Sequence, residues 1–362
     1  MAHHELLNVA DYERAAENCL DSGAFGFVAG GAGDERTLHE NLRAFARWQL
    51  RPRVLVDVGS VSAAATVLGQ AVSLPLLVAP TAFHRLVHAD GELATARAAA
   101  AAGTVMCLST LSSAAPAEIE AAAPEGIRWF QLYWARDREF TRELLAAVAE
   151  AGFTALMLTV DLPVPGLRER ELRAAFSIPT GLPLPNLAAG LPAVEFHLAI
   201  GEAVDPTLTW RDLEWLRSAC ELPLVVKGVL TAEDAKLSCE HGAAGIVVSN
   251  HGGRQLDGVP AALDVLEEVV DAVAGRAEVL VDGGIRRGND VLIALALGAR
   301  AALAGRAVLY GLAVDGERGV RRVLQLLQAE IELGLKLLGC ASPAAVTRAH
   351  VRRADAVRPS AR

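Results

Sequence analysis

The sequence alternates short apolar runs with longer stretches of helical periodicity, and the alternation recurs eight times. The runs are LPLLVA (74–79), TVMCLS (104–109), IRWFQL (127–132), TALMLT (154–159), LPLVVK (222–227), AGIVVS (244–249), AEVLVD (277–282) and RAALAG (300–305). Short apolar runs separated by helices are typical of parallel strands, because parallel neighbours need long crossover connections. Eight such units close into a (β/α)8 TIM barrel, so the predicted fold class is α/β.

One large domain is expected to comprise the whole chain, residues 1–362, because 52% hydrophobic residues are enough for one large core. Residues 1–73 precede the first run and are expected to form an N-terminal helical segment packed against the barrel. Residues 163–208, after the fourth run, form a long connection rich in proline and glycine. A connection of this length is usually functional, so we expect an active-site lid, with an oligomer contact or a simple insertion as the alternatives.

Polar, charged or glycine residues follow the apolar runs. Because all strands of such a barrel are parallel, these positions converge on its C-terminal mouth, where the active sites of this fold lie. The residues concerned are Pro80, Thr81, Ser109, Gln131, Tyr133, Thr159, Asp161, Lys227, His251, Asp282, Gly283, Gly284, Gly305 and Arg306.

Two glycine–arginine loops, VDGGIRRG and LAGRAV, follow the seventh and eighth runs, where barrels often bind phosphate. Gly283, Gly284 and Gly305 allow close approach of the backbone to an anion. Arg286 and Arg306 can add charge-assisted hydrogen bonds, so these loops predict a phosphate site. No G-x-G-x-x-G follows a predicted strand, so a dinucleotide-binding Rossmann unit is not expected.

The stretch SNHGGRQLDG, after the sixth run, places His251 and Arg254 at the predicted mouth. A neutral imidazole can accept a proton, and a guanidinium can bind a carboxylate in a bidentate manner. Asp161 follows the fourth run and can orient that imidazole, while Arg168 offers a second cation for an acid substrate. Residues at metal-ligand spacing do not surround His251 in the sequence, so no metal site is expected.

The net charge of -9 argues against nucleic-acid binding, which requires an excess of Lys and Arg. The sequence contains no uninterrupted apolar run of roughly 18 residues, so no membrane span is expected. The first residues, MAHHELLNVADYERA, lack an apolar signal region, and the cysteines form no C-x-x-C pair. These features predict a cytoplasmic enzyme.

Five motifs in the same order resemble the family of FMN-dependent L-2-hydroxy-acid oxidases and dehydrogenases, which includes glycolate, lactate and mandelate oxidases. The motifs are LVAPTAF, LTVDLP, LPLVVKGVLTAEDA, SNHGGRQLDG and VDGGIRRGNDV. The resemblance extends from about residue 6 to about residue 350. It implies a (β/α)8 barrel with FMN as cofactor, whose phosphate occupies the two glycine–arginine loops.

The resemblance also implies roles for the residues around the substrate. His251 would assist removal of the substrate α-hydrogen, and Asp161 would hold its imidazole. Arg254 and Arg168 would bind the carboxylate of the substrate, and Tyr133 would bind its hydroxyl oxygen.

The same resemblance implies a set of residues around the cofactor. Lys227 would stabilise negative charge on the reduced flavin, and residues 79–82 would line the flavin near N5. The cofactor-binding residues implied are Ala79, Pro80, Thr81, Ala82, Ser109, Gln131, Thr159, Lys227, Ser249, Asp282, Gly283, Gly284, Arg286, Gly305 and Arg306.

Two positions bear on the choice of substrate. Phe27 stands where glycolate oxidase-like sequences have a Tyr that reaches the carboxylate, and Leu111 stands where they have a Trp. The pocket therefore loses a polar contact and gains apolar space, which favours larger or aromatic, mandelate-like 2-hydroxy acids. Ala82 stands where members that use oxygen commonly have Ala, so it favours an oxidase.

The sequence-based hypothesis is therefore an FMN-dependent oxidase of an (S)-2-hydroxy acid, which forms the 2-keto acid and transfers electrons to oxygen to give hydrogen peroxide. The alternatives are a dehydrogenase that passes electrons to a quinone or carrier protein, and a non-catalytic barrel that binds a phosphometabolite. The resemblance further implies a homo-oligomer, a tetramer by analogy with the family.

Overall fold

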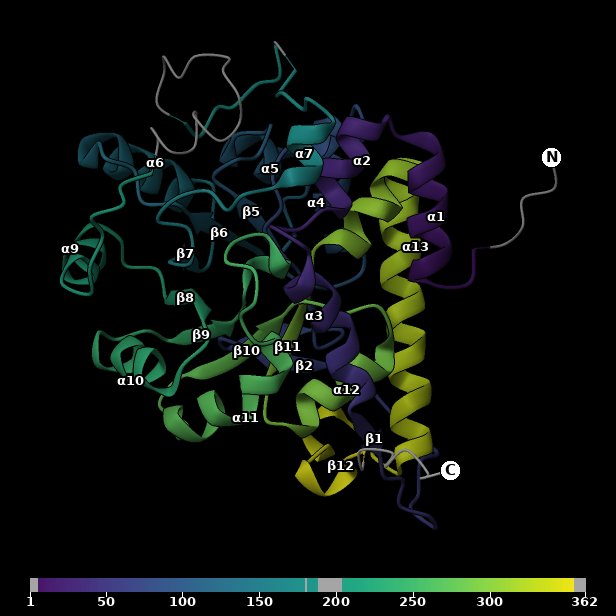
Figure 1. Cartoon of the computed structure of the whole chain (residues 1–362). Coiled ribbons are helices and arrows are strands. Elements are labelled where there is room, and N and C mark those ends of the chain that lie inside the picture. The colour runs from purple at the N-terminus through teal and green to yellow at the C-terminus, as the bar shows by residue number, and fades with distance from the viewer. Residues whose placement is uncertain (1–5, 180, 188–203, 355–362) are drawn as a thin grey trace, which may run out of the picture.

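Eight parallel strands form a closed barrel at the centre of the computed structural model, which describes residues 6–179, 181–187 and 204–354 (Figure 1). The strands are β4 (Leu76–Val78), β5 (Met106–Ser109), β6 (Arg128–Leu132), β7 (Leu156–Thr159), β8 (Leu224–Val229), β9 (Gly245–Val248), β10 (Glu278–Asp282) and β11 (Ala301–Ala304). They follow one another in chain order around the barrel, and β11 pairs with β4 to close it. Each strand overlaps one of the predicted runs, so the predicted TIM barrel is confirmed.

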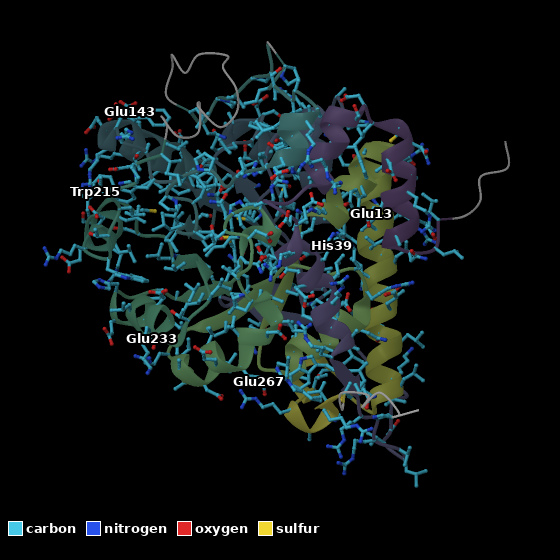
Figure 2. All side chains as sticks on the ribbon, viewed as in Figure 1. Glu13, His39, Glu143, Trp215, Glu233 and Glu267 are labelled. Carbon is cyan, nitrogen blue, oxygen red and sulfur yellow. The ribbon has the colours of Figure 1, made fainter. Side chains whose placement is uncertain are left out.

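A helix follows every barrel strand and packs outside it, as the alternation predicts (Figure 1). These helices are α4 (Gly91–Ala101), α5 (Pro116–Ala122), α6 (Arg138–Glu150), α9 (Asp212–Ala219), α10 (Ala232–Glu240), α11 (Ala262–Val273), α12 (Gly288–Ala296) and α13 (Arg306–Leu338). The backbone leaves helical geometry at Asp315 and Gly316, so α13 is two helices joined at a kink. Exposed glutamates such as Glu143 on α6 and Glu233 on α10 lie on the outer surface (Figure 2).

The segment before the barrel contains α1 (Val9–Cys19), α2 (Ser22–Ala29) and α3 (Arg36–Ala46). It also contains three short strands that the sequence did not predict, β1 (Trp48–Leu50), β2 (Ala65–Val67) and β3 (Gln70–Val72). Three-residue strands carry too little periodicity to be recognised, and β1 pairs with a distant strand, β12 (Val351–Arg353). The single-domain organisation stays a prediction.

The interior of the barrel is apolar in its lower part and mainly polar at its mouth. One apolar layer of inward-facing residues belongs to a cluster that packs against the β2–β3 hairpin; it includes Leu77, Cys107, Trp129, Met157, Val225, Val247, Leu280 and Leu303. Because alternate residues of a strand point to the same face, the residues two positions later also point inward. Those residues are Ala79, Ser109, Gln131, Thr159, Lys227, Ser249, Asp282 and Gly305. A mainly polar ring therefore lies directly above an apolar layer.

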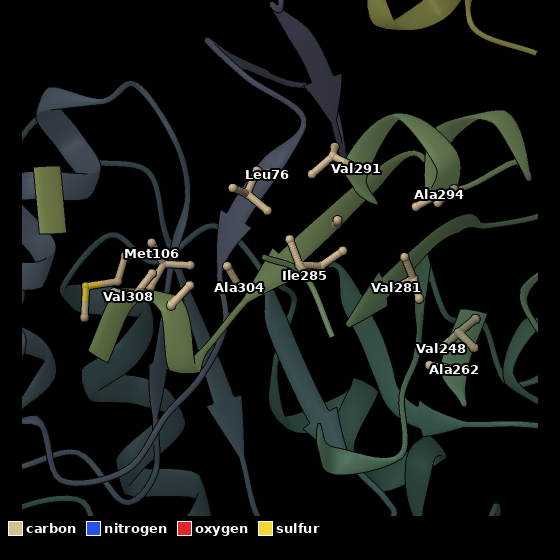
Figure 3. Close-up of a cluster of buried hydrophobic side chains, with 14 of the residues drawn as sticks. Leu76, Met106, Val248, Ala262, Val281, Ile285, Val291, Ala294, Ala304 and Val308 are labelled. Atoms are coloured by element: carbon tan, nitrogen blue, oxygen red, sulfur yellow. The ribbon is translucent and has the colours of Figure 1, made fainter. Parts of the chain in front are cut away.

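Outward-facing strand residues hold the helices against the barrel. Figure 3 shows one such cluster, which includes Leu76, Met106, Val248, Ala262, Val281, Val291, Ala294, Ala304 and Val308. Burying a side chain of Leu or Val size contributes roughly 1.5–3 kcal/mol, so this layer is a major source of stability. It fixes the strand ends on which the polar ring stands.

The long connection after β7 begins against the His251 loop. Gly166 donates a backbone hydrogen bond to Oε1 of Gln255 at 3.1 Å, and a short helix, α7 (Glu169–Arg173), follows. Residues 180 and 188–203 of the expected lid lie outside the described residues. Its action as a lid stays a prediction.

The remaining short elements are 3-10 turns, and one of them carries His251. They are η1 (His84–Leu86), η2 (His251–Gly253), η3 (Pro343–Ala345) and η4 (Arg348–His350).

A bulge in β8, the fifth strand of the barrel, places Gly228 close to Asp161, which follows the fourth strand, β7. The register of β8 against β9 shifts between Lys227 and Val229, and Gly228 adopts a φ of +113°. A Cβ at Gly228 would lie 2.6 Å from Cβ of Asp161. Glycine is required because the backbone is left-handed there and Asp161 leaves no room for a side chain.

We predict that Gly228→Ala lowers the stability of the protein by more than the roughly 1–3 kcal/mol of backbone strain alone, because a clash with Asp161 adds to it. The midpoint of urea unfolding measures this loss. Gly258→Ala is the matched control. Gly258 has a φ of +90°, and a Cβ added there would have no neighbouring heavy atom within 4 Å. Equal losses in the two variants would show that contact with Asp161 is unimportant.

Candidate active site

The polar ring at the mouth is held by internal hydrogen bonds. Nζ of Lys227 donates to Oγ of Ser249 at 2.9 Å and lies 3.1 Å from Oδ2 of Asp282. On the opposite side, Oγ of Ser109 donates to Oε1 of Gln131 at 3.0 Å. Burial disfavours the Lys227 ammonium, but the nearby negative groups, Asp282 first and then Asp161, together outweigh burial, so the pKa of Lys227 is raised. Lys227 is therefore a cation at the top of the apolar layer.

A cavity of about 950 Å³, including its part open to solvent, lies above this ring. Its mixed polar and apolar lining is that of a small-molecule site. Most of the sequence-predicted site residues line it: Phe27, Ala79, Pro80, Thr81, Ala82, Ser109, Leu111, Tyr133, Arg168, Lys227, His251, Arg254, Asp282, Gly283, Gly284, Arg286, Gly305 and Arg306. The other four, Gln131, Thr159, Asp161 and Ser249, lie beside or behind this lining.

His251 and Asp161 form a hydrogen-bonded pair at the mouth. Nδ1 of His251 lies 2.9 Å from Oδ1 of Asp161, so the carboxylate accepts a hydrogen bond from Nδ1–H and leaves Nε2 as the basic nitrogen. Burial lowers the pKa of His251, although Asp161 opposes the shift. Burial alone would raise the pKa of Asp161, but His251 and Lys227 together lower it. The pair is therefore a neutral imidazole beside a carboxylate.

Tyr133 faces the basic nitrogen of this pair, with its hydroxyl oxygen 3.3 Å from Nε2 of His251. Burial raises the pKa of Tyr133 to about 12. Its hydroxyl is thus protonated and can donate a hydrogen bond at the point where a substrate oxygen would approach the imidazole.

The His251 turn is held in an unusual conformation. His251 has a φ of +58°, a left-handed value that costs energy in residues other than glycine. The side-chain amides of Asn250 and Asn41 bond each other reciprocally at 2.8 Å in both directions. Asn41 belongs to α3, so the segment before the barrel fixes the turn that presents His251.

Two arginines, Arg254 three positions after His251 and Arg168 in the long connection, line the same cavity and share one carboxylate. Oε1 of Glu171 lies 3.2 Å from Nη2 of Arg254 and 3.4 Å from Nη1 of Arg168. Burial and the charge of Arg168 lower the pKa of Arg254, while Glu171 opposes the shift. The three groups form a compact ion cluster at the cavity wall, which we call the arginine clamp.

Aromatic rings pack beside the arginine clamp. The Phe27 ring stacks on Phe176 with centroids 5.1 Å apart and lies 5.6 Å from Phe83. Cζ of Arg254 lies 4.9 Å from the centre of the Phe27 ring, in a cation–π contact. The wall next to the arginine clamp is therefore apolar, as the sequence indicated from Phe27 and Leu111.

The two glycine–arginine loops meet at the far end of the cavity. Arg306 begins α13 and donates to three backbone carbonyls, from Nε to Val28 at 3.0 Å, from Nη1 to Gly252 at 3.0 Å and from Nη2 to Gly30 at 2.7 Å. Burial lowers the pKa of Arg306 to about 10. Neutral carbonyls satisfy its hydrogen bonds but leave its positive charge uncompensated, so an anion in the cavity would stabilise it.

A close approach between α3 and the first loop shapes this end of the cavity. A Cβ at Gly284, where φ is +82°, would lie 2.1 Å from the carbonyl oxygen of Asn41. Arg286 follows with Nε 3.8 Å from Oε2 of Glu13 and its guanidinium carbon 5.7 Å from the centre of the Tyr310 ring. Two arginines and the start of α13 thus face the same space.

A model of the FMN-dependent dehydrogenase family matches residues 16–353. The chain belongs to this family. An L-lactate oxidase from Nostoc sp. is 51% identical over 346 residues, which cover 92% of this chain and 94% of that protein. Glycolate oxidase 3 from Arabidopsis thaliana is 47% identical over 356 residues, which cover 96% of each chain.

Among solved structures, the chain is similar to a crystal structure of mandelate oxidase with (S)-4-hydroxymandelic acid. The TM-score is 0.92 at 43% sequence identity, and the match covers 96% of this chain and 99% of that chain. The predicted family, FMN-dependent 2-hydroxy-acid oxidoreductases with a TIM barrel, is therefore confirmed.

FMN is accordingly the cofactor of this family member, and the cavity suits it. Within the described residues, two buried polar atoms of the ring have no hydrogen-bond partner, Nε2 of Gln131 and Oδ1 of Asp282. Buried donors and acceptors are rarely left unpaired, so these atoms indicate a polar ligand. Flavin carbonyls and ribityl hydroxyls offer the complementary groups. The lining of the cavity by Gly305 and Arg306 fits a phosphate at its far end.

No group of three or more His, Cys, Asp or Glu side chains suited to a metal ion occurs in the described ranges. Within the same ranges, no helix combines the length and the apolar character needed to span a membrane.

Two residues that shape the site were missed by the sequence analysis. Glu171 lies in the expected lid, within a run of charged residues, RERELR, that resembles a solvated surface. Asn41 lies on a helix before the barrel. A carboxylate three positions after Arg168, on one face of a helical turn, was the available signal for Glu171.

We predict that Arg306→Ala weakens FMN binding by roughly 1.5–3 kcal/mol, the value of a hydrogen bond to a charged group. Quenching of FMN fluorescence on titration into apoprotein measures the dissociation constant. Arg300→Ala is the matched control. Arg306 follows strand β11 at the mouth, whereas Arg300 precedes β11 at the opposite end of the barrel and donates to the Thr66 carbonyl at 2.6 Å. An Arg306→Ala protein that binds FMN as tightly as Arg300→Ala would remove Arg306 from the phosphate site.

Proposed function

We propose that this family member oxidises larger or aromatic L-2-hydroxy acids to 2-keto acids, with molecular oxygen as electron acceptor and hydrogen peroxide as the second product. The observation that supports it is that the imidazole of the His251–Asp161 pair and both guanidinium groups of the arginine clamp line one cavity, whose floor is the polar ring. A 2-hydroxy acid needs a cation for its carboxylate, a base for its proton and an acceptor for its electrons. Bound FMN supplies that electron acceptor.

The chain's own residues would orient and deprotonate the substrate. Arg254 and Arg168 hold its carboxylate, and planar guanidinium groups suit such pairing. Nε2 of His251 assists removal of the substrate α-hydrogen by accepting a proton, and Asp161 then stabilises the imidazolium that forms. Tyr133 donates a hydrogen bond to the substrate hydroxyl oxygen. Lys227 opposes the negative charge that accumulates near the polar ring during the reaction.

Two features of the wall support the choice of substrate and acceptor. Phe27 presents a ring and no hydroxyl, and Leu111 is a buried aliphatic side chain at the cavity. Together they favour an apolar substituent over glycolate, and mandelate oxidase is among the similar solved structures. Ala82 lines the same cavity, at the position where oxygen-using members commonly have Ala.

An exposed apolar turn supports the proposal that the protein is a homo-oligomer, a tetramer by analogy with the family. The exposed fractions of Val54, Leu55 and Val56 are 82%, 103% and 45%. Contiguous exposed apolar residues commonly mark protein interfaces. A cytoplasmic location likewise stays part of the proposal, and sedimentation of the holoprotein would measure the oligomeric state.

We predict that anaerobic mixing with an L-2-hydroxy acid bleaches the flavin at a rate that falls in acid. Only the neutral imidazole can accept the proton, and burial lowers the pKa of His251 below 6.5, so the rate should decline only below that pH. Asp161 raises the pKa of His251, so Asp161→Asn should move the decline to lower pH and reduce the plateau rate by roughly 10²-fold or more. Stopped-flow absorbance over a pH series measures both effects.

Three results would contradict this mechanism or its acceptor. A rate independent of pH in both proteins would exclude His251 as the base. Failure of every 2-hydroxy acid to bleach the flavin would exclude the proposed activity. Slow reoxidation in air with rapid reduction of a quinone or dye would identify a dehydrogenase instead of an oxidase.

We predict that Phe27→Tyr raises kcat/KM for glycolate relative to mandelate by about 0.5–1.5 kcal/mol, the net value of one hydrogen bond. A Tyr hydroxyl would restore a contact to the carboxylate, which matters most to a small acid with little apolar surface. Mandelate already gains roughly 25 cal/mol per Å² of ring surface buried against Phe27 and Leu111. Steady-state kinetics of both proteins with both acids test this. A wild-type preference for glycolate that the variant leaves unchanged would exclude selection by Phe27.

A further inference from the structure

A buried histidine that the proposed reaction does not use lies behind the wall of the cavity. His84 begins η1, three positions after Thr81, and is only 2% exposed. Its Nε2 lies 2.7 Å from Oγ1 of Thr81, and its Nδ1 lies 3.0 Å from Oγ1 of Thr95 on α4. The imidazole therefore bridges a residue of the cavity lining and a helix outside the barrel.

The His84 imidazole is neutral. Burial lowers its pKa, although the negative charge of Glu92 opposes the shift. Glu92 itself accepts hydrogen bonds from the backbone N–H groups of His84 at 3.0 Å and of Ser113 at 2.8 Å. Because a neutral imidazole carries one ring proton, one of its nitrogens donates a hydrogen bond and the other accepts one.

The hydroxyl of Thr95 determines which nitrogen carries that proton. Thr95 is fully buried, and Nδ1 of His84 is the one hydrogen-bond partner of its side chain in the part of the chain that the structure describes. A proton on Nδ1 would leave the hydroxyl proton of Thr95 buried without an acceptor, which is unfavourable. Thr95 therefore donates to Nδ1, and Nε2 carries the proton and donates to Thr81.

This assignment leaves Thr81 with a hydroxyl proton that His84 does not use. Oγ1 of Thr81 accepts from Nε2–H, so its own O–H group can donate to an acceptor atom in the cavity. Thr81 lines the cavity beside Gly305, where an added Cβ would lie 3.2 Å from the Thr81 methyl carbon. FMN offers many acceptors to such a donor, because its carbonyl, ribityl and phosphate oxygens all have free lone pairs.

We propose that His84 is a positioning residue for the cofactor, which fixes Thr81 as a hydrogen-bond donor to bound FMN. Thr95 fixes the imidazole in turn, so a chain of three side chains runs from α4 to the cavity. His84 lies behind the lining and acts through Thr81. The inference rests on FMN as the cofactor and is independent of the substrate and of the electron acceptor.

The test measures the dissociation constant of FMN, from the fluorescence of cofactor released when the holoprotein is diluted. An Asn side chain reaches the position of Nδ1, and the amide nitrogen of Gln reaches that of Nε2, so two variants separate the contacts of the ring. His84→Asn can keep the bond to Thr95 but loses the bond to Thr81, and it should weaken FMN binding roughly threefold to tenfold. His84→Gln still donates to Thr81 and should bind FMN within about twofold of the wild type. Equal affinities in the two variants would overturn the proposal.

A double-mutant cycle with Thr81→Val shows whether His84 acts through Thr81, which general loosening of the site would not mimic. Valine keeps the shape of threonine but lacks its hydroxyl. In the Thr81→Val protein, His84→Asn should therefore cause no further loss of FMN affinity. Losses that add up in the double variant would contradict the proposed route.

His88→Asn is the matched control. His88 lies four positions later in the same loop, where its Nδ1 accepts from the backbone N–H of Asp90 at 3.2 Å and its ring lies against Gly316 of α13. The substitution removes an imidazole from this loop without altering a contact of Thr81, so FMN affinity should equal that of the wild type. A loss as large as that in His84→Asn would assign the effect to the loop in general and overturn the proposal.

Variants of the two threonines keep the proposal testable if His84→Asn does not fold. Thr81→Ser keeps the hydroxyl and should retain FMN like the wild type, whereas Thr81→Val should weaken binding roughly threefold to tenfold. Thr95→Val removes the donor that fixes the imidazole and should weaken binding in the same direction. An unchanged FMN affinity in either Val variant would overturn the proposal.

Discussion

Closure of eight parallel strands into a barrel is the constraint on which the rest of the structure depends. Successive side chains of a strand point to opposite faces, so closure directs every second residue into a narrow interior. Mid-strand inward residues such as Trp129 and Leu280 are fully buried and apolar. The next inward residues, such as Gln131 and Asp282, are polar and also buried. The active site is therefore a polar layer of buried side chains built on an apolar one.

Burial explains why the charges at the mouth occur in sets. Lys227 pairs with Asp282, His251 pairs with Asp161, and Glu171 joins the two arginines of the clamp. A buried charge without such a partner would be costly. The ligands of an FMN-dependent enzyme that acts on hydroxy acids are themselves anions. The remaining positive charges, at the clamp and at the glycine–arginine loops, are therefore where these anions are expected to bind.

Much of the site could be predicted because, in a parallel barrel, the position of a residue along its strand determines where its side chain lies. The C-terminal end of every parallel strand lies at the mouth, so Lys227 in β8 and His251 just after β9 could be assigned from the sequence. The same logic fails in the long connection, where no period determines the direction of a side chain. Glu171 was missed for this reason. Asn41 was missed because it lies on a helix outside the repeating units, yet its amide bonds Asn250 at 2.8 Å.

The sequence by itself determined the barrel, the strand ends and the residue types that meet at the mouth, because these follow from local periodicity. Only the tertiary structure decided which partner each charge takes. Glu171 and Arg254 are 83 positions apart in the chain, and Arg306 reaches the carbonyl of Val28 across 278 positions. Such pairings depend on distances of a few ångströms between segments that no local pattern relates. The charged residues of the clamp are present in the sequence, but they come into contact only in the folded protein.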